Sequence, residues 1–77
     1  MKDYTIDVTH IEELQTLKDV HELEKIFAKA QSTVVNGELV VLARKALNGP
    51  LQKFDVISNL EELKQYRDTV FKYLTPP

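Results

Sequence analysis

The chain has 77 residues, 43% of them hydrophobic and 29% charged, with a net charge of −2 and no cysteine. A chain of this length forms one domain, residues 1–77, and the lack of cysteine excludes disulfides and thiolate metal sites. The weak net charge argues against binding that depends mainly on attraction to nucleic-acid phosphates. Domains this small have a marginal core, so a partner subunit would be a useful source of further stability.

The first residues contain no apolar stretch of the kind found in a signal peptide. The longest apolar run, Leu39–Ala43, is much shorter than the ~20 residues of a membrane-spanning helix. We therefore expect a cytoplasmic protein without a membrane segment.

The N-terminal third of the chain predicts two helices. Residues 4–8 alternate with a period of two, which fits either a short edge strand or a loose arm. A short helix follows, because Thr9 lies three residues before Glu12, the spacing of a capping box. A second helix is predicted from about Val20 to Gln31, with Asp19 as its N-cap.

Asn36-Gly37 lies between two segments that favour β-structure. This pair is a strong signal for a β-hairpin, because both residues of its turn need a positive φ. The pattern favours a first strand at 33–35 and a second at about 38–47. A competing interpretation extends the preceding helix to Val35 and makes Gly37 its C-terminal cap.

A second turn, Asn48-Gly49-Pro50, precedes a strand predicted at 51–57, in which Lys53 and Asp55 share one face. The strand before this turn is apolar on both faces, which is typical of the middle of a sheet. A C-terminal helix is predicted over about 60–74, with Arg67 inside its apolar stripe. The predicted fold class is therefore α+β: two N-terminal helices, a three-stranded antiparallel β-meander and a C-terminal helix.

The sequence offers little support for catalysis or metal binding. His10 and His21 each lie three residues before a glutamate, a spacing that can hold a divalent metal on one helix face. Neither belongs to a denser cluster, so two surface histidines are the simpler interpretation. A Gly-x-Ser-x-Gly motif and a glycine-rich phosphate loop are both missing. We expect no catalytic residue, no cofactor, no metal and no enzymatic activity.

Charge is distributed unevenly along the chain. Residues 39–54 contain three basic residues and no acidic one, whereas residues 1–38 have a net charge of −4. Basic residues on exposed strands often serve only to prevent edge-to-edge aggregation. The same basic hairpin could also dock on an acidic surface of another protein or of a second copy.

The candidate interaction surface combines the polar residues of the hairpin with two tyrosines, seven residues apart, on the last helix: Arg44, Lys45, Gln52, Lys53, Tyr66 and Tyr73. Such tyrosines are as typical of a core margin as of an interface. The leading hypothesis is a small non-catalytic interaction or assembly module, with a homodimer as one form. A metal-binding protein or small enzyme is the second alternative. The first alternative is a β-ribbon, the basic hairpin 39–54, that binds nucleic acid. That binding would be weak, because three cations neutralise at most about three phosphates.

Overall fold

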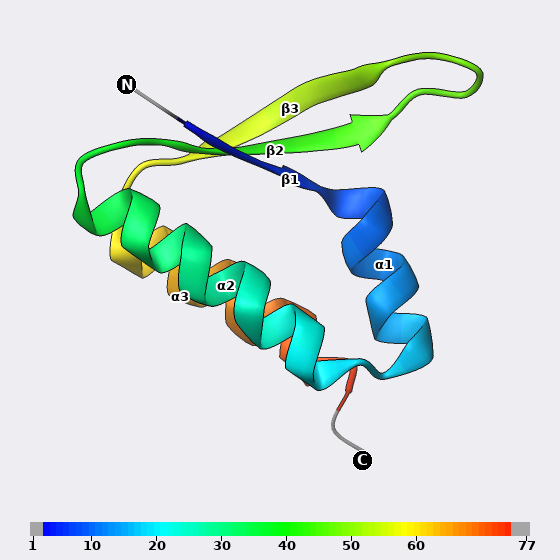
Figure 1. Cartoon of the computed structure of the whole chain (residues 1–77), viewed down its shortest axis with the longest axis horizontal. Coiled ribbons are helices and arrows are strands. Elements are labelled where there is room, and N and C mark those ends of the chain that lie inside the picture. The colour runs from blue at the N-terminus through cyan, green and yellow to red at the C-terminus, as the bar shows by residue number, and fades with distance from the viewer. Residues whose placement is uncertain (1–2, 75–77) are drawn as a thin grey trace.

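The computed structural model describes residues 3–74 (Figure 1). These residues form a small α+β domain with three helices and a three-stranded mixed sheet, in which β2 lies between β1 and β3. The α+β fold class is therefore confirmed. The elements in chain order are β1 (Tyr4–Asp7), α1 (Val8–Leu17), α2 (Val20–Val35), β2 (Val40–Lys45), β3 (Leu51–Ile57) and α3 (Leu60–Lys72).

The predicted antiparallel meander is wrong in its first strand. The meander placed residues 33–35 beside β2, but the strand at that position is β1, from the N-terminus. It runs parallel to β2, with Tyr4 opposite Val40. The pairing of β2 with β3 is antiparallel, as predicted. Residues 33–35 form the last turn of α2 instead of a strand. Residues 4–7 take the position in the sheet that the meander assigned to residues 33–35. Of the two interpretations of residues 4–8, the edge strand is therefore correct for residues 4–7, whereas Val8 begins α1.

Asn36-Gly37 ends α2 and does not form a hairpin turn. Asn36 has a φ of −81°, and only Gly37 has a positive φ, of 81°. The N–H of Gly37 donates to the carbonyl of Val34, and the N–H of Glu38 to that of Thr33, both at 3.0 Å. This is the Schellman motif, which needs one left-handed residue, whereas a type I′ hairpin turn needs two. The longer helix with a glycine cap is therefore the correct interpretation.

Aspartates fix the starts of the first two helices. The carboxylate of Asp19 accepts a hydrogen bond from the N–H of Glu22 at 3.1 Å, which confirms it as the N-cap of α2. The first helix begins at Val8, earlier than predicted, because Asp7 accepts from the N–H of Thr9 at 2.9 Å. Each cap pairs an N–H group that the first turn of a helix leaves without a partner.

All three helices lie on one side of the sheet, which we call its inner face (Figure 1). No helix in the described part of the chain covers the opposite, outer face. The rings of Tyr66 and Phe71 on α3 contact Phe27 of α2, with centroid distances of 5.6 and 5.9 Å. The core between the two layers consists of Ile6, Val8, Ile11, Leu14, Leu23, Phe27, Ala30, Val40, Leu42, Ile57, Leu63 and Val70.

A β-bulge changes the direction of the side chains in β3. Leu42 lies opposite Asp55, but Ala43 lies opposite Lys53, so Phe54 is an extra residue in the ladder. Lys53 consequently shares the outer face with Ala43, while Asp55 shares the inner face with Leu42. The prediction that Lys53 and Asp55 share one face is therefore wrong.

Candidate functional site

The β2–β3 hairpin brings together four of the six predicted interaction residues. Arg44 lies opposite Gln52 in the ladder, and Lys53 lies opposite Ala43. The four residues line one shallow hollow of about 280 Å³: Arg44, Lys45, Gln52 and Lys53, together with Ala46 and Phe54. The local chain reversal at the hairpin is sufficient to assemble this group.

Arg44 already has a partner within the chain. Its guanidinium donates two hydrogen bonds to the carboxylate of Glu12 on α1, at 2.8 and 3.4 Å. Hydrogen bonding to Glu12 is the main reason why the pKa of Arg44 is raised. Both side chains are about half exposed, so the pair contributes little to stability. It does connect the hairpin to α1, and it leaves Lys45 and Lys53 as the hairpin cations without an ion pair among residues 3–74.

The end of the hairpin combines these cations with exposed apolar side chains. The turn after β2 extends past α1 (Figure 1), and Leu47 at this turn is 96% exposed. Leu51 and Phe54 on β3 are also exposed. Lys45 shares the outer face with Leu51, its partner in the ladder. Exposed apolar groups of this size beside charged ones are typical of a surface that binds another protein.

Of the two tyrosines predicted on the last helix, only Tyr66 lies near the hairpin, where it lines a hollow with Leu42 of β2 and Asp55 of β3. Tyr73 follows the last residue of α3 and is 76% exposed. Tyr66 is half-buried against Phe27, and its buried Oη forms no hydrogen bond with any residue that the structure describes. Burial is the main cause that raises the pKa of Tyr66 to about 12, and the negative charge of Glu12 adds to the shift. Tyr66 therefore belongs to the margin of the core.

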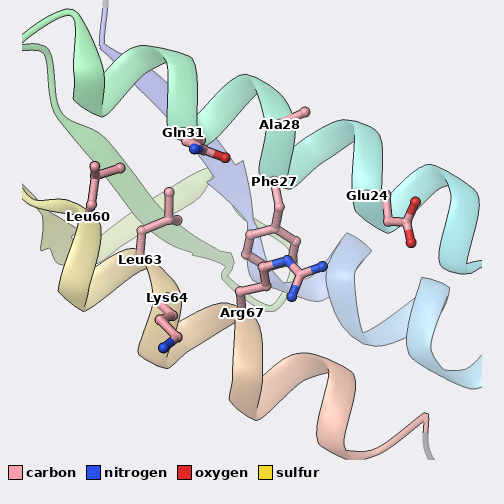
Figure 2. Close-up of a pocket in the computed structure, with 8 residues that line it drawn as sticks. All are labelled: Glu24, Phe27, Ala28, Gln31, Leu60, Leu63, Lys64 and Arg67. Carbon is pink, nitrogen blue, oxygen red and sulfur yellow. The ribbon is translucent and has the colours of Figure 1, made fainter.

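A second hollow, of about 570 Å³, lies between α2 and α3 (Figure 2). The buried side chains of Phe27 and Leu63 form its floor. Figure 2 shows Glu24 at one end of this groove, Leu60 at the other, and Arg67 between them. The exposed residues along its two rims are Glu24, Ala28 and Gln31 on α2, and Leu60, Lys64 and Arg67 on α3.

None of these groove residues was predicted as an interaction residue. The available signal was Arg67, a charged residue inside the apolar stripe of the last helix. Its guanidinium carbon lies 4.5 Å from the ring centroid of Phe71, a distance at which cation–π attraction is significant. Within the described range, Glu24, Lys64 and Arg67 form no ion pair. The groove therefore has an acidic group on one rim and two basic groups on the other, none of them in an ion pair with another described residue.

Residues 3–74 contain no group of three or more histidine, cysteine, aspartate or glutamate side chains that could hold a metal ion. None of the helices in this range has the length and apolar character needed to cross a membrane. Comparisons with protein families, curated proteins and solved structures gave no match. The function is therefore inferred from the hairpin and the α2–α3 groove themselves.

Proposed function

We propose that this protein is a small non-catalytic interaction module, and that its β2–β3 hairpin docks on an acidic surface of a partner protein. The observation that carries the proposal is the exposure of Leu47, Leu51 and Phe54 beside Lys45 and Lys53. Large apolar side chains that gather on one projecting segment, and that the core does not use, are typical of a binding surface.

The chemistry of the hairpin defines the partner. Apolar side chains that become buried supply most of the affinity of an interface, whereas charges at its rim orient the partners and accelerate their encounter. Leu47 and Phe54 would be the anchors, and Lys45 and Lys53 the rim charges. The matching surface is an apolar depression bordered by aspartate or glutamate.

Nucleic acid is the second candidate partner. A two-stranded ribbon can enter a major groove, and the outer face of this hairpin presents Lys45 and Lys53. The pairing of Arg44 with Glu12 removes one of the three hairpin cations from this task. The remaining two can neutralise about two phosphates, which gives weak binding at physiological salt. A protein partner is therefore better supported.

The test is a variant that reverses the charge of the hairpin, Lys45→Glu/Lys53→Glu. Its control, Lys25→Glu/Lys72→Glu, makes the same change at two exposed helix positions outside the hairpin. Affinity capture from native lysate should recover a protein that the wild type and the control retain and that the hairpin variant loses. Mobility-shift assays with DNA and RNA at low salt are carried out on the same three proteins.

The outcomes distinguish the two candidates. Equal capture of every protein by the hairpin variant and the control would contradict docking through the hairpin. A nucleic-acid shift that the wild type and the control show and the hairpin variant lacks would instead identify the protein as a β-ribbon binder.

A further inference from the structure

We infer that the face formed by α2 and α3 is a homodimer interface, on which a second copy of this chain packs its own α2 and α3. This face is separate from the hairpin, so the inference goes beyond the partner proposed above and does not depend on it. It rests on two exposed helix stripes and on the positions of the charges that lie along them.

Each helix presents an exposed or half-exposed stripe at intervals of three or four residues, the spacing of a single helix face. Both stripes carry large apolar residues near their ends, and between them lie polar or charged residues and the small Ala28. Val35 at one end is 65% exposed. The α2 stripe is Val20, Glu24, Ala28, Gln31 and Val35, and the α3 stripe is Leu60, Lys64, Arg67 and Phe71. Both stripes supply rim residues of the groove in Figure 2.

A two-fold axis along the groove makes this face complementary to itself. The helices α2 and α3 run antiparallel (Figure 1), and rotation about such an axis places α2 of one copy over α3 of the other at the same level. The acidic rim of each copy, with Glu24, then faces the basic rim of the second copy, with Lys64 and Arg67. Glu24 lies further along the groove than Arg67 (Figure 2), and the long side chain of Arg67 can span this offset to form two ion pairs. The apolar stem of Lys64 can cover the small side chain of Ala28.

The other possible two-fold axis, across the groove, is unfavourable. It would place α2 on α2 and α3 on α3. Lys64 lies near the middle of the α3 rim, between Leu60 and Arg67, so it would face Lys64 of the second copy. Like charges that meet in an interface disfavour that arrangement. The charges of the groove therefore select the axis along it.

The size of the face indicates a reversible dimer. At 1.5 Å per residue the 16-residue α2 is about 24 Å long, and two neighbouring helices are about 20 Å wide, so the face covers roughly 500 Å². Stable complexes bury about 800 Å² per partner. We therefore expect monomer and dimer to exchange, with the dimer dominant only at high protein concentration.

Sedimentation equilibrium of the full chain over about 5 to 500 µM tests this interface, because mass action converts monomer into dimer over such a range. Glu24→Arg and Arg67→Glu each replace two attractive contacts by two repulsive ones. Each variant alone should weaken self-association by about tenfold or more.

A mixture of the two variants should associate at least as tightly as the wild type. In the heterodimer the arginine introduced in one copy lies opposite the glutamate introduced in the other. The unchanged Arg67 of the first copy likewise lies opposite the unchanged Glu24 of the second, so both ion pairs are restored.

Matched controls reverse the same charges at exposed positions outside the groove: Lys25→Glu for Arg67→Glu, and Glu61→Arg for Glu24→Arg. Both controls, and the hairpin variant Lys45→Glu/Lys53→Glu, should dimerise like the wild type, so a failure of this inference is distinguishable from a failure of the hairpin proposal. A wild type that remains monomeric at about 500 µM overturns the inference. So does a dimer that Arg67→Glu does not weaken, or a mixture that associates no better than the separate variants.

Discussion

Tyr66 combines two roles at the margin of the core. Its ring contacts Phe27, whereas its hydroxyl is buried without a hydrogen-bond partner among the described residues. Burial favours the neutral phenol, which raises the pKa of Tyr66 from 10.0 to about 12. Because the folded-state pKa is the higher one, Tyr66 contributes stability that is fully present below pH 10 and is lost as the pH rises through about 12.

Tyr66→Phe should remove this alkaline sensitivity, because it keeps the ring and removes the proton. At pH 7 the variant should be as stable as the wild type or about 1 kcal/mol more stable, since a buried hydroxyl without a partner costs free energy. Between about pH 10 and 12 the wild type should lose stability relative to the variant. Urea unfolding of both proteins across this range measures the difference. Parallel pH profiles would contradict the prediction.

At the scale of single elements, the end of α2 depends on one backbone conformation. Gly37 has a φ of 81°, and its N–H pairs with the last turn of the helix. A Cβ at this position would meet no atom of the described residues within 4 Å, so only the strained backbone conformation disfavours a side chain there. This cap therefore stabilises the helical conformation of residues 33–35 over a strand.

Gly37→Ala should destabilise the fold by about 1 to 2 kcal/mol, because an L-residue is strained in the left-handed region. Gly49→Ala is the matched control, since Gly49 lies outside that region and its added Cβ would be 3.4 Å from the Cβ of Ala46. We expect the control to change the free energy of unfolding by less than about 0.5 kcal/mol in either direction. Urea unfolding compares the two variants, and equal costs would contradict the explanation.

At the scale of the whole molecule, the sheet depends on the return of the N-terminus to its middle strand. Tyr4 pairs with Val40 and Asp7 with Ala43, residues that are far apart in the sequence. Ile6 lies between them on the inner face and is 2% exposed. The side chain of this single strand residue therefore joins β1 to the core that the three helices share.

Ile6→Ala should cost about 2 to 4 kcal/mol, the usual cost of a cavity at a buried isoleucine. A core of this size supplies only about 3 to 5 kcal/mol, so most of the cooperative thermal transition should be lost. Thr5→Ala, on the outer face and exposed, should leave the transition nearly unchanged. Circular dichroism during heating follows all three proteins. A variant at Ile6 that melts like the wild type would show that β1 is not part of the cooperative fold.

The sequence by itself determined the features that depend on neighbouring residues. Asp19 caps α2 as its spacing predicted, and the turn at Asn48-Gly49-Pro50 joins β2 to β3 and brings Arg44, Lys45, Gln52 and Lys53 together. Local hydrogen bonds and the geometry of a short turn are sufficient for these features.

Only the tertiary structure decided which segment lies beside β2 and which helix faces meet. The sequence of residues 33–35 is compatible with a strand as well as with a helix end. In the folded chain β1 occupies the position beside β2 that such a strand would take. The bulge at Phe54 and the groove between α2 and α3 likewise result from contacts between distant segments. Such contacts form only after a large entropic cost of loop closure, so local patterns do not encode them.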